Sequence, residues 1–459
     1  MLLCIQLSIS LFKKLLLLVN VMTIQYINII MDLTKHFQQL LDDHWTFLNA
    51  GWPTITPRNN HRTVSKEIGY MPEIKETLNR RLGPIPVYFF LVDIWPKVKY
   101  PGPYKEVEKG LLMLYHLVKG LSMEAMEPHM PKSSFHAMHS VFYKKEYTLH
   151  NKYITNCIAT MFSTIKIRLL SAKEKNPPLF KHVTLHLDGH DTRATYKGES
   201  SADMYSYKLK KSGLRTQVAM DCNGMALFVS KSASCKNNAD GTMLLTMKLD
   251  KRVHEMDCIA LDGGYPQFLR RLIDESDTLK VQNFAHPYRK QKNKELTQEE
   301  ALYNTTFGSF RSQMESLFAD LGSTFEKHNN RTPVLVDKKQ TYNLQLKLSL
   351  LLLNMKKMVA LLKISAEPIH TAWLREGFEY PTTENDVEQP MGYVDVGALV
   401  EDGNTMAQLQ NKFLGINLHG DVDVNVDEDT PMDQAVIMQP GLSIELRGTK
   451  RQMDVNGNL

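Results

Sequence analysis

The stretch Lys181-His-Val-Thr-Leu-His-Leu-Asp188-Gly-His-Asp191 decides the fold. Its apolar residues Val183, Leu185 and Leu187 alternate with polar ones, which is the pattern of a β-strand. We expect the strand to end at Asp188, because an acid followed by glycine favours a turn. A carboxylate at the end of a strand can be held rigidly toward a cleft.

Two further acids lie in comparable settings downstream. In Met256-Asp-Cys-Ile-Ala-Leu-Asp262-Gly a short apolar run again ends in an acid and a glycine. Glu315 lies in a segment whose apolar residues recur at helical spacing, namely Phe307, Phe310, Met314, Leu317, Phe318 and Leu321. Two acids at strand ends and one on a helix can converge on a pair of divalent metal ions.

Seven pieces of the chain, taken in order, carry a resemblance. They are Leu187-Asp188-Gly189, the segment 209–224, Asp240-Gly241, Leu261-Asp262-Gly-Gly-Tyr265-Pro266, Pro287-Tyr-Arg-Lys, the segment 296–304, and Arg311 with Glu315. Together they resemble the DDE-superfamily endonuclease domain of Harbinger-type transposases. The resemblance runs from about residue 181 to about residue 353.

The resemblance implies an α/β fold class, with a ribonuclease-H-like catalytic domain and an all-α, helix-turn-helix-like N-terminal region. The excess of acidic residues at the C-terminal end predicts a weakly ordered acidic tail. Asn223-Gly224 agrees with the resemblance, because this pair is a strong hairpin signal between two predicted strands. We divide the chain into an apolar leader over 1–30, a region without an assigned role over 31–105, a helix-turn-helix-like region over 106–165, the DDE endonuclease domain over 180–365 and the acidic tail over 380–459.

The resemblance also implies the chemistry. Asp188, Asp262 and Glu315 would be the catalytic and metal-binding residues, with Mg²⁺ or Mn²⁺ as cofactor because carboxylate oxygens suit these hard ions. Hydrolysis of phosphodiester bonds at element ends would precede strand transfer, and two metal ions would stabilise the attacking and leaving oxygens. The alternative is a domesticated, transposase-derived nuclear DNA-binding protein without catalytic activity.

Candidate DNA contacts come from three regions. Residues 106–120, 121–128 and 131–142 predict three helices, similar to the helix-turn-helix that precedes this catalytic domain. The third helix would offer Lys132, Ser133, Ser134 and His136 to phosphates and base edges. The other candidates are Lys208, Lys210, Lys211, Arg289, Lys290 and Arg311. A plain helical linker and a solvated strand end are the alternative interpretations of the first two regions.

Charge is distributed unevenly over the 459 residues. Residues 380–459 contain 14 Asp and Glu against 4 Lys and Arg, a net charge of −10, so that 1–379 carry +15 of the total of +5. A basic body with an acidic tail is typical of proteins that handle a polyanion, and acidic tails also serve solubility. Five scattered cysteines without a CxxC pair indicate neither a disulfide framework nor a zinc site.

These observations define the expected surroundings of the protein. Scattered cysteines favour a reducing compartment, and we expect the nucleus. The expected partner is double-stranded DNA. A separate DNA-binding partner protein and a homo-oligomer stay open as further partners, and no membrane association is expected. The apolar segment 342–358 is interpreted as a core or docking helix, because lysines and Asn354 interrupt it.

Three interpretations compete for the apolar leader over 1–30. A signal peptide lacks a small-residue cleavage site here, and Lys13-Lys14 divides the run that a membrane span would need. We therefore favour a non-native extension, with translation starting at Met22 or Met31. A secreted or membrane protein is the third functional class, and it rests on this leader alone.

Other acids and histidines were weighed as site residues. Asp191 could replace Asp188, but the Leu-Asp-Gly context favours Asp188. His186 and His190 are not expected to bind zinc, because a strand leading into a turn would not place them like ligands on a helix. The segment 421–428 begins like a calcium loop, yet it lacks the glycine and glutamate that such a loop requires, so we interpret it as a disordered acidic run.

Overall fold

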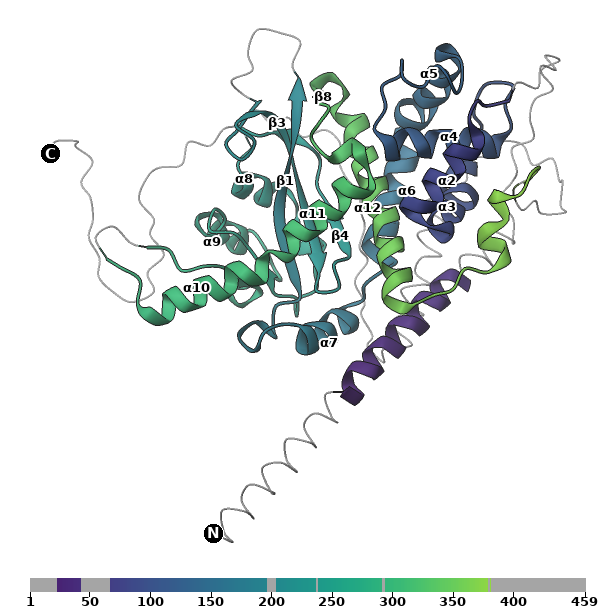
Figure 1. Cartoon of the computed structure of the whole chain (residues 1–459). Coiled ribbons are helices and arrows are strands. Elements are labelled where there is room, and N and C mark those ends of the chain that lie inside the picture. Colours follow the sequence, from purple (N-terminus) through teal and green to yellow (C-terminus); the bar gives the residue numbers. More distant parts are fainter. Residues whose placement is uncertain are drawn as a thin grey trace, which may run out of the picture. The chain divides into compact units, whose positions relative to one another are not determined.

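The computed structural model describes residues 23–42, 67–195, 204–236, 238–290, 294–378 and 380 (Figure 1). These residues form a mixed α/β structure. Its helical part, mainly residues 67–175, precedes a mixed sheet that carries helices on both faces. Residues 1–22 of the leader, the acidic tail after residue 380 and the candidate calcium loop over 421–428 lie outside the described residues.

The helical part begins with a helix over 23–42. It continues through α2 (Met71–Leu82), α3 (Pro84–Phe89), α4 (Glu106–Lys119), α5 (Lys132–Ser140), α6 (Tyr147–Thr160) and α7 (Ile165–Lys175). The helix over 23–42 packs on the chain before α7, where Phe37 and Phe162 stack with their ring centroids 6.2 Å apart. The boundary expected after residue 30 falls inside this helix, whose Ile29 is buried.

The predicted helix triplet is present only in part. α4 ends at Gly120, as expected, and this glycine takes the left-handed conformation of a helix C-cap, with φ at 61°. α5 also forms. The predicted middle helix over 121–128 is wrong, because residues 121–130 make turns instead. Pro128 cannot donate a backbone hydrogen bond, and the carbonyl of His129 accepts one from the backbone N–H of Gly69, 3.0 Å away.

The sheet is built on two long antiparallel strands, β1 (Leu185–Thr195) and β3 (Lys211–Asp221). The shorter strands are β2 (Tyr205–Ser206), β4 (Ala226–Val229), β5 (Ala233–Ser234), β6 (Ile259–Ala260), β7 (Phe284–Ala285) and β8 (Val334–Leu335). β4 pairs antiparallel with β3 across Asn223-Gly224, which confirms the predicted hairpin. On the other side, β6 runs parallel to β1 and β7 parallel to β6, so the order is β4–β3–β1–β6–β7.

The predicted end of the first strand is wrong, because β1 continues past Asp188 to residue 195. Polar groups beyond Asp188 find partners within the sheet, as Asp191 does in Arg215 of β3. Gly189 makes no turn. A Cβ atom at this position would lie 2.5 Å from a carboxylate oxygen of Asp240, so the glycine serves close packing within a strand.

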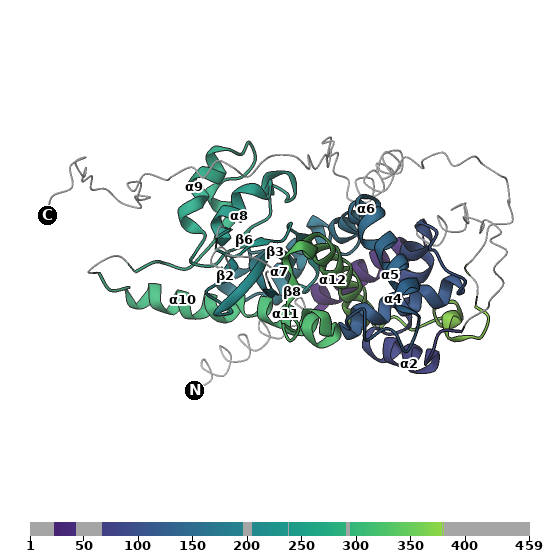
Figure 2. The same cartoon turned by 90° about the horizontal axis from the view of Figure 1, so that it is seen from above.

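Helices cover both faces of the sheet (Figure 2). α8 (Asp240–Thr246) and α9 (Pro266–Asp274) lie on one face, over a cluster that contains Leu187 and Ile259. α10 (Gln298–Arg311) and α11 (Gln313–Thr324) lie on the other, where Phe310 packs in a cluster with Ala260. Successive residues of a strand point to opposite faces. The odd-numbered residues of β1 therefore face α8 and α9, and its even-numbered residues face α10 and α11.

α12 (Lys339–Leu362) joins the helical part to the sheet. Its buried Lys347 donates hydrogen bonds to Asn151 and Thr155 of α6, at 2.7 and 3.1 Å. Asn354 exchanges hydrogen bonds with the backbone of Ala226 in β4, at 2.8 and 2.6 Å. α12 is thus a core helix, as expected. No helix in the described part of the chain is long and apolar enough to cross a membrane.

Candidate active site

The sheet brings Asp188 and Asp262 to the same face. In the parallel pair of β1 and β6, His186 lies opposite Ala260. Two residues further along each strand are Asp188 and Asp262, so both acids stand at one level and point toward α10. Asp262 lies two residues beyond β6, where the sequence places it. Neighbouring strands are about 4.8 Å apart, which lets the two carboxylates share a cation.

Arg311, at the end of α10, is that cation. Its guanidinium lies 3.2 Å from the Asp188 carboxylate and 3.4 Å from the Asp262 carboxylate. The side chain of Asp188 is 15% exposed and that of Asp262 is 57% exposed, so the pair opens to solvent on the Asp262 side. Arg311 is a predicted DNA contact, and its ion pairs with the two acids were not predicted from the sequence. The available signal was its position four residues before Glu315.

Glu315 is exposed on α11. Side chains four residues apart on a helix are neighbours, so Glu315 and Arg311 lie on the same side of the nearly continuous helix formed by α10 and α11. Within the described ranges, however, no three His, Cys, Asp or Glu side chains lie close enough to hold a metal ion together. The structure therefore brings two of the three predicted acids together and leaves Glu315 at the next helical turn.

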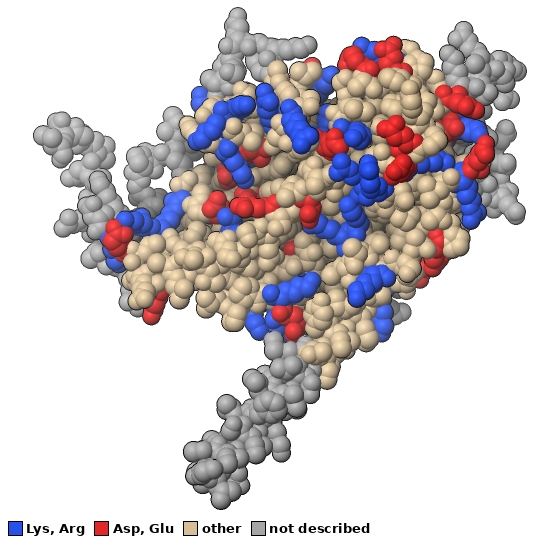
Figure 3. All heavy atoms as spheres, viewed as in Figure 1, with Lys and Arg blue, Asp and Glu red and all other residues tan. Residues whose placement is uncertain are grey.

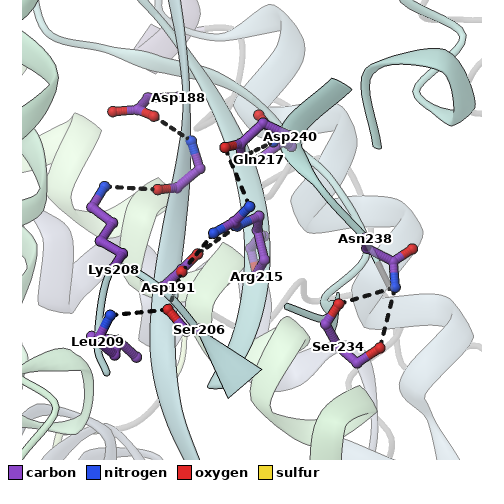
Figure 4. Close-up of polar contacts among 12 residues, drawn as sticks. Asp188, Asp191, Ser206, Lys208, Leu209, Arg215, Gln217, Ser234, Asn238 and Asp240 are labelled. Atoms are coloured by element: carbon purple, nitrogen blue, oxygen red, sulfur yellow. Dashed lines mark hydrogen bonds and ion pairs between the residues drawn. The ribbon is translucent and has the colours of Figure 1, made fainter. Parts of the chain in front are cut away.

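Two of the predicted basic contacts border the acid pair. Lys208 donates to the backbone carbonyl of the residue after Asp188, at 3.2 Å (Figure 4). Arg289 donates to the carbonyl of the residue after Asp262, at 2.9 Å. Both cations thus stand where they can meet a phosphate near the acids. The other candidates in this region, Lys210, Lys211 and Lys290, are exposed.

The four predicted contacts on α5 lie in the helical part. Lys132, Ser133 and His136 are exposed and Ser134 is half-buried. Lys132 forms an ion pair with Glu124, 2.8 Å away, and both side chains are open to solvent. α5 therefore presents a polar face to solvent, as a DNA-contacting helix requires, and a plain linker helix would do the same.

Asp191, the alternative to Asp188, faces α8 and α9 and its oxygens are occupied (Figure 4). Arg215 donates to both of them, at 2.6 and 2.7 Å, and Ser206 donates to one at 2.6 Å. Burial by itself would raise the pKa of Asp191, but the hydrogen bonds from Arg215 and Ser206 outweigh it and lower that pKa. Asp191 is consequently an ionised structural residue.

A fourth acid, Asp240 at the start of α8, joins this network. It lies 3.2 Å from the Arg215 guanidinium and accepts a hydrogen bond of 2.8 Å from Gln217. Burial raises the pKa of Asp240, Arg215 opposes that shift, and the negative charges of Asp188 and Asp191 add to it. Asp240-Gly241 belongs to the resemblance, but the sequence alone predicted no role for it.

The face toward α10 and α11 keeps buried polar atoms that make no hydrogen bond within the described residues. They are Nδ1 and Nε2 of His186, Nε2 of His190 and Nε of Arg311. Burial lowers the pKa of both histidines to about 4, helped by the charge of Arg311 at His186 and of Lys208 at His190. The two rings do share a face, because residues four apart on a strand point the same way. They pack on Phe310 and Phe318, with ring centroids 4.6 and 4.7 Å apart.

The segment that carries this geometry is similar to a known family. Residues 189–354 match the family model of the DDE superfamily endonuclease. The match contains Asp262, Arg311 and Glu315, and it begins one residue after Asp188. For this DDE-like segment it supports a transposase or endonuclease function, with DNA as the consistent substrate. No curated protein and no solved structure matches the chain.

Proposed function

We propose that the chain is a metal-dependent DNA endonuclease of the Harbinger type, which hydrolyses phosphodiester bonds at the ends of an element and then transfers the freed strand to target DNA. The proposal rests on the contact of both Asp188 and Asp262 with Arg311. Asp188 lies one residue before the DDE-like segment, and Asp262 and Arg311 lie within it. The strand order β4–β3–β1–β6–β7, with two antiparallel pairs followed by two parallel ones, supports a ribonuclease-H-like core.

The acid pair fits a divalent metal ion by donor type. Asp188 and Asp262 present carboxylate oxygens to one cation already, and such hard oxygen ligands suit Mg²⁺ or Mn²⁺. Asp262 is open to solvent. Glu315, one helical turn beyond Arg311, is the third ligand in our proposal. Ions held here would supply an activated water and stabilise the leaving oxygen of the phosphodiester.

The chain's own cations account for the placement of DNA. Lys208 and Arg289 are fixed by backbone carbonyls beside Asp188 and Asp262, and each keeps further N–H groups for phosphate oxygens. Neutral His186 and His190 fill the face beside Asp188 without adding charge at pH 7, because their pKa lies near 4. The negative charge of the acid pair therefore remains available to a metal ion.

The test is nicking of duplex DNA that carries the ends of the chain's own element, with Mg²⁺ or Mn²⁺ and with any partner protein supplied. We expect the wild-type chain to nick. Asp262→Asn should slow nicking by at least about 10²-fold, because the amide keeps the shape of the side chain and removes its charge. DNA affinity should stay within about twofold, because phosphate contacts come mainly from Lys and Arg. Asp274→Asn, on the exposed surface of α9, is the matched control and should nick like the wild type.

The outcome decides between the enzyme and its alternative. If the wild type and Asp262→Asn are equally inactive with the partner present, the domesticated DNA-binding protein replaces the transposase. Nuclear localisation belongs to the same proposal, because the substrate is DNA. Imaging of the tagged full chain tests it.

A further inference from the structure

A group of cations lies where the helical part meets α11 and α12. Its members come from the ends of α2 and α4, from the helical turns η8 (Glu326–His328) and η9 (Val336–Lys338), and from α12. They are Arg81, Lys119, Lys327, Lys338, Lys356 and Lys357, and we call them the α4–α12 basic surface. Figure 3 shows Lys and Arg side chains gathered over this part of the molecule, next to a row of acidic side chains.

Direct contacts join segments of this surface that are far apart in the sequence. The carboxylate of Glu326 lies 2.9 Å from Arg81 and 3.2 Å from Lys119. The ammonium of Lys356 donates to the backbone carbonyl of Arg81 at 2.6 Å. Side chains from α2, α4, η8 and α12 therefore form one continuous polar surface.

A second part of this surface contains Lys327 and Lys338. The C-cap of α4 packs tightly on the first of them, because a Cβ atom at Gly120 would lie 2.7 Å from the backbone nitrogen of Lys327. Burial lowers the pKa of Lys327, and the positive charge of Lys338 adds to that shift. Both lysines also lower the pKa of His139 on α5, after burial and a neighbouring histidine. Lys327 thus lies against the C-terminal end of α4, and its charge and that of Lys338 act on His139 of α5.

Acidic side chains balance only part of this charge. Glu326 serves both Arg81 and Lys119, and Asp320 on α11 lies 2.8 Å from Lys357. With exposed Asp337 beside Lys338 in η9, three acids against six cations leave an excess of three positive charges among these residues. Like charges this close repel one another. A surface that gathers them fits a polyanion such as a nucleic-acid backbone.

We propose that the α4–α12 basic surface holds the sugar-phosphate backbone of the duplex DNA whose scissile phosphate lies at Asp188 and Asp262. The proposal rests on the proposed nuclease function. α11 connects the two places, with Glu315 near its start and Thr324 at its end, three residues before Lys327. The nine helical steps from Glu315 to Thr324 span about 14 Å, which corresponds to about four nucleotides along one strand. A duplex lying along α11 reaches both places.

The test is the salt dependence of binding to a duplex of about 30 base pairs and arbitrary sequence, measured by fluorescence anisotropy with the full chain. The variant with Lys327→Gln, Lys338→Gln and Lys357→Gln removes three charges and keeps most of each alkyl chain. The slope of log K against log salt concentration is negative, and each lost phosphate contact reduces its magnitude by about 0.9. We therefore expect the magnitude of the slope to decrease by about 2 to 3. The matched control carries Lys173→Gln, Lys181→Gln and Lys251→Gln, three exposed lysines elsewhere, and should keep the wild-type slope.

Folding and substrate class are checked separately. Circular dichroism should give both variants the unfolding temperature of the wild type. If the triple variant unfolds early, Lys338→Gln alone, at an exposed position, should lower the slope by about 0.9. Equal slopes for a folded variant and its control would overturn the proposal. Tighter binding of double-stranded RNA than of DNA of the same length would also overturn it.

The nicking assay keeps this proposal distinct from the nuclease function. A lowered slope combined with a wild type that cuts no DNA would retain the basic surface as a DNA-binding site and remove the nuclease. An unchanged slope combined with metal-dependent nicking by the wild type would retain the nuclease and place its DNA elsewhere.

Discussion

Polar side chains on the two faces of β1 differ in whether they find hydrogen-bond partners. On the face toward α8 and α9 the polar groups bond to one another, through Asp191, Arg215, Asp240, Gln217 and Tyr265. On the face toward α10 and α11, Asp188 and Asp262 share one guanidinium, and ring nitrogens of His186 and His190 make no hydrogen bond within the described residues. Buried polar groups without partners destabilise a fold by about 1–3 kcal/mol each. The first face is therefore built for stability, whereas the second leaves buried ring nitrogens without partners and opens to solvent at Asp262.

The largest expected difference between the faces is the effect on stability and nicking of replacing Asp191 or Asp188, which lie three residues apart on β1. The Asp191 side chain is only 1% exposed and accepts two hydrogen bonds from Arg215 and one from Ser206. Asp191→Asn would break this bidentate pair and leave Arg215 with Asp240 alone, 3.2 Å away, so we expect the free energy of unfolding to fall by about 3–5 kcal/mol. Asp188→Asn leaves Arg311 paired with Asp262, so the fall should be about 1–2 kcal/mol. Nicking should instead drop by at least about 10²-fold. Denaturant titrations and the nicking assay measure the two effects.

Each variant is the control for the other, because both convert a carboxylate of β1 to an amide. If Asp188→Asn destabilised the protein more than Asp191→Asn, the pair at Arg311 would be the structural one. The assignment of the two faces would then be reversed.

Local signals in the sequence predicted much of this arrangement. The alternation of Val183, Leu185 and Leu187 predicted the strand, and Asn223-Gly224 predicted the hairpin, because each depends on neighbouring residues. The end of β1 was mispredicted because the partner that stabilises Asp191 comes from β3. The middle helix over 121–128 was mispredicted because its turns are fixed partly by Gly69, far away in sequence.

The candidate site shows the same limit. Two apolar runs ending in acids predicted Asp188 and Asp262 as a pair, and the parallel register of β1 and β6 brings them together. The position of Arg311 between them depends on how α10 crosses the sheet, which no local pattern encodes. The α4–α12 basic surface was missed for the same reason, since its cations come from five separate segments.

A smaller effect should show whether Arg311 competes with a metal ion or orients the two carboxylates. Arg311→Ala removes a guanidinium that lies 3.2 and 3.4 Å from the two carboxylates. Because a cation bound there competes with a metal ion, we expect Mn²⁺ to bind about tenfold more tightly, a change of about 1.4 kcal/mol. Isothermal titration calorimetry measures this without any turnover. Arg331→Ala, at an exposed arginine, is the control and should leave Mn²⁺ affinity unchanged. Weaker binding by Arg311→Ala would show that Arg311 orients the acids instead.

An effect of similar size concerns α12 and its buried Lys347. This helix contacts the face of β1 toward α10 and α11, where Tyr342 hydrogen-bonds with Thr192. Burial lowers the pKa of Lys347 from 10.5 to about 7, and the charges of Arg252 and Lys231 add to this shift. Between pH 7 and 10.5 the unfolded chain therefore binds more protons at this lysine than the folded chain. Its contribution to stability must rise with pH across that window. The hydrogen bonds to Asn151 and Thr155 then fix the docking of α12 on α6 more than they stabilise it.

Lys347→Met tests whether the buried polar groups of α12 lower the stability of the fold. Replacing a buried charge by an apolar side chain of similar length should raise the free energy of unfolding by about 1–2 kcal/mol at pH 7. It should also flatten the rise in stability between pH 7 and 10, because the titrating group is gone. Urea titrations across that range measure both effects, with Lys173→Met on exposed α7 surface as the control. A variant less stable than the wild type at every pH would show that the polar contacts of α12 stabilise the fold, as the network around Asp191 does. The difference between the two faces of β1 would then be confined to Asp188, Asp262, His186 and His190.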